Sequence, residues 1–195
     1  IVSIGEFAFS SVESLEEIEL NEGLKTINDH AFSECSNLKS VVFPTTLESI
    51  GQSSFWGCTS ITEVVLPEGL ITLENFAFND CTNLKKVSLP STITNEVSFS
   101  KECPDICPES LEEINLTDNW KYYYLDVTYY PDIHEEPDIR FHILTDKSYV
   151  DYPGSYYDLT DNNRTALFCT ATHKTAMKIN GEDLTWGEQQ IKGKY

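Results

Sequence analysis

Residues 38–50 read LKSVVFPTTLESI, and this pattern of apolar residues returns every 23 positions along the first half of the chain. The preceding copy, at residues 15–27, reads LEEIELNEGLKTI, and the following copy, at residues 61–73, reads ITEVVLPEGLITL. Each unit also carries one phenylalanine in the same place, at Phe9, Phe32, Phe55 and Phe78. Apolar columns at a fixed step predict a solenoid, whose units cannot fold alone and whose stacked units share one core.

Each unit contains the run L-x-x-V-x-L, which is the strand signature of leucine-rich repeats. Because successive side chains on a strand point to opposite faces, we expect Ile18 to face the core, and Glu17 and Glu19 to face outward. The strands then form a parallel sheet whose outward residues line the concave wall of the solenoid. A second short strand or an irregular arc is expected near residues 47–50, and a helical turn over the stretch that contains the phenylalanine.

The whole unit, I-x-x-x-A-F-x-x-C-x-x-L-x-x-V-x-L-P, resembles the BspA-type leucine-rich repeat, which occurs in surface and secreted proteins of bacteria and some protozoan parasites. The resemblance covers residues 1–116. It implies a leucine-rich-repeat solenoid in a secreted or surface-exposed protein, with adhesion as its role. It carries no implication for residues 117–195.

The repeat becomes irregular before residue 116. Leu111, Ile114 and Leu116 repeat the strand pattern, but the step from Leu84 to Leu111 is 27 residues, which places an insertion near residues 101–108. We therefore predict a solenoid over residues 1–116, with four clear units and a degenerate fifth. The chain opens inside a repeat unit, which indicates a fragment of a longer protein.

Residues 117–195 are rich in tyrosine and aspartate and lack the 23-residue step. β-branched and aromatic residues gather there between turn-forming residues, so a small β-rich domain is predicted. Its strands are expected in residues 120–130, 139–144, 165–172 and 176–181. Three aromatic side chains of this region could stack on sugar rings, although packing inside the domain explains them as well. They are Trp120, Tyr156 and Trp186.

The chain has a formal charge of -19, which is concentrated in the predicted solenoid, where residues 1–116 hold 19 acidic and 5 basic side chains. Such a surface repels phosphate groups, so nucleic acids and anionic membranes are excluded as partners. The acidity either keeps a secreted protein soluble or attracts a basic partner or divalent cations. The chain has no apolar run long enough for a membrane span.

The six cysteines fall into different classes. Cys35, Cys58 and Cys81 form a column at the 23-residue step, and we expect them to be free thiols buried between coils. Cys103 and Cys107 lie in the insertion, where either a local disulfide or two free thiols would fit. No second cysteine pair or close histidine pair completes a zinc site, so no metal is expected.

No nucleophile elbow, P-loop or dinucleotide fingerprint is present, so we expect neither enzymatic activity nor a cofactor. The favoured function is an extracellular or cell-surface module that binds macromolecules, namely a host or neighbouring-cell protein or, less favoured, a glycan. The alternative is a structural spacer that presents a C-terminal glycan-binding or anchoring β-domain. The partner is expected on the concave face, at Glu17, Glu19, Ser40, Val42, Glu63, Val65, Lys86, Ser88, Glu113 and Asn115.

Overall fold

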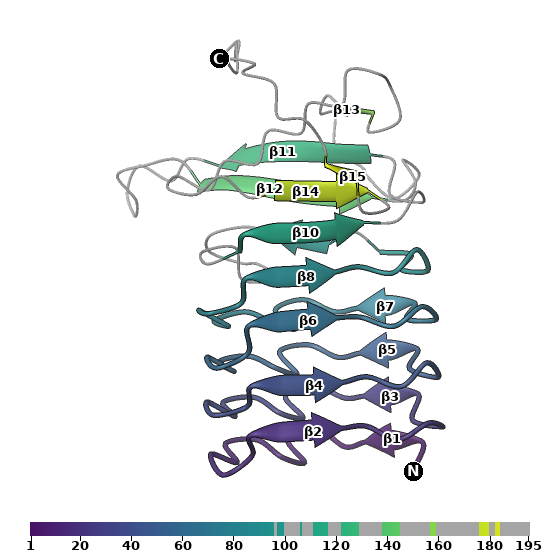
Figure 1. The fold of residues 1–195 in the computed structure, drawn as a ribbon, viewed down its shortest axis with the longest axis vertical. Coiled ribbons are helices and arrows are strands. Elements are labelled where there is room, and N and C mark those ends of the chain that lie inside the picture. Colours follow the sequence, from purple (N-terminus) through teal and green to yellow (C-terminus); the bar gives the residue numbers. More distant parts are fainter. Residues whose placement is uncertain are drawn as a thin grey trace.

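In the computed structural model, the repeat units are successive coils stacked along the long axis of the molecule (Figure 1). The structure describes residues 1–95, 97–99, 106, 111–116, 122–128, 138–144, 157–158, 176–179 and 182–183. Each of the four coils in residues 1–95 has three sides: a strand of three residues, a strand of two residues, and a series of turns. The predicted leucine-rich-repeat solenoid is therefore confirmed.

The longer strands lie side by side along one side of the stack, and we call their outward surface the strand face (Figure 1). Neighbouring strands are parallel, and the 23-residue step sets their register, so that Glu17 lies opposite Ser40 and Glu63 opposite Lys86. The last step is the predicted 27 residues, from Lys86 to Glu113. These strands are β2 (Glu17–Glu19), β4 (Ser40–Val42), β6 (Glu63–Val65), β8 (Lys86–Ser88) and β10 (Glu113–Leu116).

A second parallel sheet forms the next side of each coil, where either a strand or an arc was expected. Its strands pair in the order β1, β3, β5 and β7, again with a step of 23 residues. Each strand is two residues long, and the second residue points into the core as Ile4, Ile27, Ile50 or Leu73. The strands are β1 (Ser3–Ile4), β3 (Thr26–Ile27), β5 (Ser49–Ile50) and β7 (Thr72–Leu73).

The third side consists of tight turns. The prediction of a helical turn around the phenylalanine is therefore wrong. In the first coil, N–H groups of Phe7, Phe9 and Ser11 donate to carbonyl oxygens one coil further on, and the next two coils repeat this pattern. A helix would keep these donors within its own coil. Two positions in each turn have positive φ, which a helix does not allow: Phe7, His30, Ser53 and Phe76 in one column, and Ser11, Glu34, Gly57 and Asp80 in the other.

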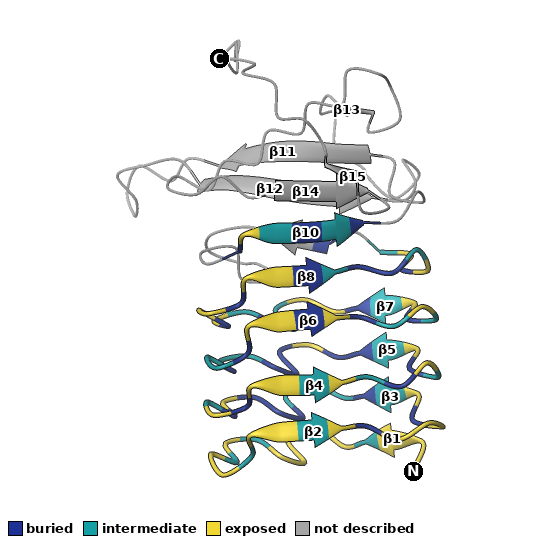
Figure 2. Ribbon diagram, in the orientation of Figure 1, coloured by how far each residue is buried: buried dark blue, intermediate teal, exposed yellow. Residues whose placement is uncertain are grey.

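The core lies between the three sides and consists of the predicted columns (Figure 2). Phe32, Phe55 and Phe78 are fully buried, and their rings stack face to face with centroids 5.1 Å apart. Phe9 stacks on Phe32 at 5.2 Å but is 41% exposed, because the first coil has a neighbour on one side only. Stacked rings in a dry column make each coil depend on the next for its stability.

The three column cysteines are buried and form no disulfide bond, as expected. Each thiol donates a hydrogen bond to a phenylalanine carbonyl oxygen of the preceding coil, with Cys58 Sγ 3.2 Å from the oxygen of Phe32. Burial raises the pKa of the Cys58 thiol to about 12. A thiol that stays protonated and inaccessible packs as a small apolar side chain, not as a reactive group.

Strands also occur after residue 116, in three of the four segments where the sequence predicts them. β11 (Tyr122–Thr128) pairs antiparallel with β12 (Asp138–Leu144), which also pairs with β9 (Val97–Phe99). The fourth segment, 165–172, lies outside the described residues. A separate β-rich domain over residues 117–195 stays a prediction.

The remaining strands after residue 116 are short. β13 (Tyr157–Asp158) pairs with β11, and β15 (Glu182–Asp183) pairs with β14 (Ala176–Ile179). β14 itself pairs in parallel with β10, which places it in the same sheet as β6, β8 and β10. At least this strand therefore continues the solenoid sheet.

Candidate functional site

The strand face carries the predicted partner-binding residues in two rows that run across the strands. Because the strands are in register, the first residue of each strand falls in one row and the third in the other. Five strands about 4.8 Å apart give each row a length of about 19 Å. The first row is Glu17, Ser40, Glu63, Lys86 and Glu113, and the second row is Glu19, Val42, Val65, Ser88 and Asn115.

Two exposed valines occupy the middle of the second row. Val42 on β4 and Val65 on β6 are each 56% exposed, and their strands contact each other. The residues between the rows point inward, and they are half-buried at Ile18 and Val41 and buried at Val64, Val87 and Ile114. The core is thus built from these residues and not from the valines of the second row. An apolar pair held on rigid strands and surrounded by polar side chains has the arrangement of a small interface centre.

The end of the strand face near β10 is less accessible than the rest (Figure 2). Ser88, Glu113 and Asn115 are half-buried, whereas the row residues from β2 to β6 are exposed. Asn115 Nδ2 donates to Glu113 Oε1 at 3.0 Å and to Ser88 Oγ at 3.4 Å. These three predicted residues bond one another, so the accessible part of the strand face extends from β2 to β8.

The accessible part of the strand face is acidic. Glu17, Glu19 and Glu63 supply its carboxylates, and Lys86 is the basic side chain in its rows. Lys39, just before β4, forms a 2.7 Å ion pair with Glu16. This hydrogen bond lowers the pKa of the Glu16 carboxyl and raises the pKa of the Lys39 ammonium.

The strand face keeps its negative charge although Lys39 lies close to it. Lys39 forms its ion pair with Glu16, outside the rows, and its charge also acts on Glu17. The rows from β2 to β8 still carry more carboxylates, at Glu17, Glu19 and Glu63, than basic groups, at Lys86. A partner would therefore meet an apolar pair flanked by negative charge. Negative charge of this kind attracts basic groups.

The other predicted site residues lie outside the described residues. These are the aromatic residues Trp120, Tyr156 and Trp186, considered for glycan stacking, and Cys103 and Cys107, considered for a disulfide. Their roles stay predictions. Within the part of the chain that is described, no group of three or more histidine, cysteine or acidic side chains is arranged to hold a metal ion.

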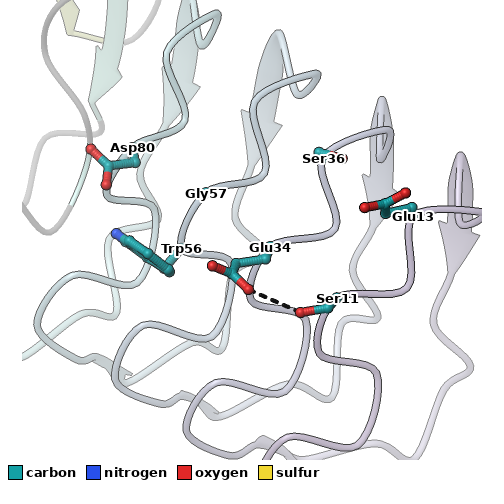
Figure 3. Close-up of a pocket in the computed structure, with 7 residues that line it drawn as sticks. All are labelled: Ser11, Glu13, Glu34, Ser36, Trp56, Gly57 and Asp80. Carbon is teal, nitrogen blue, oxygen red and sulfur yellow. Dashed lines mark hydrogen bonds between the residues drawn. The ribbon is translucent and has the colours of Figure 1, made fainter.

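The sequence analysis missed a pocket on the turn side of the solenoid (Figure 3). It is open to solvent, has a volume of about 450 Å³, and spans four successive coils. A column comparison would have pointed to it, because Trp56 stands where the other coils have Ser10, Ser33 and Asn79. Its lining includes Ser11, Glu13, Glu34, Trp56, Gly57 and Asp80.

A family model identifies the type of leucine-rich repeat in this chain. Residues 2–127 match the model of the BspA type leucine rich repeat region, with 6 copies of the repeat. The chain belongs to this family. The BspA-type match runs past Leu116, the predicted end of the solenoid, and into β11.

Two solved structures share the fold of this BspA-type chain. The pneumococcal vaccine antigen PcpA is 23% identical with a TM-score of 0.50, and the match covers 59% of this chain and 28% of that one. A leucine rich cell surface protein from Faecalibacterium prausnitzii A2-165 is 25% identical with a TM-score of 0.54, and the match covers 60% and 30% of the two chains. The match thus corresponds to less than a third of each of those proteins.

The comparison with curated protein sequences gave no match. None of the described residues belongs to a helix long and apolar enough to cross a membrane.

Proposed function

We propose that this chain is an extracellular or cell-surface module that binds another protein through its strand face and catalyses no reaction. The proposed location rests on the BspA-type repeat and on the similar fold of the leucine rich cell surface protein from Faecalibacterium prausnitzii. The partner is a protein of a host or neighbouring cell. In the alternative, the solenoid is a structural spacer, and glycan binding or anchoring belongs to residues 117–195.

The exposed valine pair is the observation that carries the proposal. A strand of a solenoid needs its inward residue for the core, and its outward residues are free to serve solubility. Val42 and Val65 do not serve solubility, because each exposes more than half of its apolar surface. Burying both under a partner would stabilise the complex, since apolar area removed from water contributes about 25 cal/mol per Å².

The acidic residues around the valines define the chemistry of the partner. Glu17, Glu19 and Glu63 flank the pair, so a complementary surface would combine an apolar side chain with lysine or arginine residues around it. Charges at the rim of an interface mainly accelerate association, and salt screens them. The proposed interaction is therefore expected to form more slowly as the ionic strength rises.

The test measures binding of the fluorescently labelled chain to intact host or neighbouring cells. We expect saturable binding that disappears after the cells are treated with protease, because the partner is a protein. The double variant Val42→Glu/Val65→Glu should weaken binding by at least about tenfold, since it places two charges in the centre of the interface.

Ile71→Glu is the matched control. Ile71 is 45% exposed and lies just before β7, on a different side of the coil from the strand face. It introduces the same kind of change outside the proposed surface and should leave binding unchanged. Wild-type binding by the double valine variant would rule out the strand face, and binding that survives protease but not glycosidase would rule out a protein partner.

A further inference from the structure

The pocket on the turn side exists because two adjacent residues of the third coil differ from their counterparts. Gly57 occupies a positive-φ column in which the other coils carry the side chains of Ser11, Glu34 and Asp80. A missing side chain leaves a notch between Glu34 and Asp80. Beside the notch, Trp56 supplies an indole where neighbouring coils have serine or asparagine, and Figure 3 shows it between Glu34 and Asp80.

The notch is not required by the backbone. A Cβ atom on Gly57 would meet Glu34 at 3.7 Å, which is ordinary van der Waals contact, and the neighbouring coils adopt the same positive φ with non-glycine residues. A side chain therefore fits in this place, and its absence leaves room for a ligand group next to the indole. This room is open to solvent and lies in the turns, away from the strand face.

The walls of the notch carry negative charge. Glu13, Glu34 and Asp80 line the pocket, and none of its lining residues is basic. One oxygen of Glu34, Oε2, accepts a hydrogen bond from Ser11 Oγ at 2.9 Å, which orients this carboxylate. An aromatic ring attracts cations to its face, and nearby carboxylates add direct attraction, so both features favour the same kind of ligand.

Two other ligand classes fit this arrangement less well. A bare metal ion needs several oxygen ligands converging on one point, and the described acidic residues do not converge in this way. A neutral sugar would use the indole ring but would gain nothing from the charge of the carboxylates. A cationic side chain can contact the indole ring and is attracted by the carboxylates at the same time.

We propose that the Trp56 pocket binds an arginine or lysine side chain of a partner protein. The cationic group lies in the notch at Gly57, against the Trp56 ring and between the carboxylates of Glu34 and Asp80. Arginine is favoured over lysine, because its planar guanidinium stacks on an aromatic ring and can bond two carboxylate oxygens at once. The pocket is thus a second attachment point, independent of the strand face.

The test follows the indole N–H signal of Trp56 in a ¹⁵N-labelled chain while acetyl-triarginine amide is added. Trp56→Ser identifies the signal by its loss, and this change is compatible with the fold because Ser10 and Ser33 occupy the same column. We expect a saturable shift with the arginine peptide. The matching citrulline peptide, which has nearly the same shape without the charge, should give no shift.

Two pairs of variants separate a local site from general attraction to an acidic protein. Glu34→Gln/Asp80→Asn should weaken peptide binding by at least about tenfold, whereas Glu17→Gln/Glu19→Gln removes the same charge elsewhere and should have little effect. Gly57→Asn fills the notch with a residue that tolerates positive φ and should abolish binding. The dispersion of the remaining amide signals confirms that each variant is folded.

Several results would overturn the proposal. Equal binding of the citrulline peptide would remove the role of charge, and equal weakening by the two carboxylate pairs would show binding without a defined site. A Trp56 signal that responds to neutral oligosaccharides but not to the arginine peptide would make the pocket a glycan site instead.

Discussion

Ser54 occupies a core column in which the other coils have Ala8, Ala31 and Ala77. Its side chain is fully buried, and its hydroxyl has no hydrogen-bond partner among the described residues. Burying an unpaired hydroxyl costs free energy that an alanine does not lose. We expect Ser54→Ala to raise the free energy of unfolding by about 1 kcal/mol, as measured by urea denaturation.

The reciprocal change is the control for this prediction. Ala31→Ser introduces a hydroxyl at the equivalent place one coil earlier, and it should lower the free energy of unfolding by about 1–2 kcal/mol. A loss of stability in Ser54→Ala would mean that the hydroxyl has a partner in the folded protein. The sequence shows the substitution in the column, but its cost depends on the burial that the structure gives.

At the scale of single elements, the phenylalanine stack holds neighbouring coils together. Phe55 is fully buried between Phe32 and Phe78, and Phe43 meets it edge-on with centroids 5.7 Å apart. We expect Phe55→Ala to lower the free energy of unfolding by about 3–5 kcal/mol, because it leaves a cavity in the middle of the core. Circular dichroism during urea denaturation measures the loss.

Phe9→Ala is the matched comparison in the same column. Phe9 is 41% exposed and stacks on one ring only, so its truncation should cost about 1 kcal/mol. Equal costs for the two variants would contradict the view that burial between two coils determines the contribution of each ring.

The strands could be predicted from the sequence, and the turns could not. Alternation of core and outward residues specifies a strand directly, and the 23-residue step adds its register, so β2 to β8 lie where the pattern places them. The turn positions with positive φ are occupied by residues as different as Phe7, His30 and Ser53. Their conformation follows from hydrogen bonds to the next coil, which a local pattern does not contain.

At the scale of the whole molecule, strand register determines how much of the candidate site can be predicted from the sequence. The rows of the strand face follow from strand register, so residues distant in sequence could be assigned to one surface. Register does not give accessibility, and Glu113 and Asn115 proved half-buried. The Trp56 pocket depends on side chains that differ between coils. The repeat pattern contains only the residues that the coils share, so it does not predict this pocket.

The net charge of -19 gives a prediction for the molecule as a whole. Within the described residues, the ion pairs Lys25–Glu48, Lys39–Glu16 and Lys85–Glu112 link neighbouring coils, and they are exposed and contribute little to stability. Repulsion among the remaining carboxylates opposes folding more strongly, and salt screens it. Raising NaCl from about 0.02 M to about 0.5 M should therefore raise the Tm by a few degrees, as measured by calorimetry.

Glu17→Gln/Glu19→Gln tests the cause of this salt effect. The variant removes two charges from the strand face without touching the core, so its Tm should exceed the wild-type value at low salt and approach it at high salt. A Tm that falls as salt is added would show that the exposed ion pairs outweigh the repulsion. If charge removal raised the Tm equally at both salt concentrations, its effect would come from local structure and not from the overall charge.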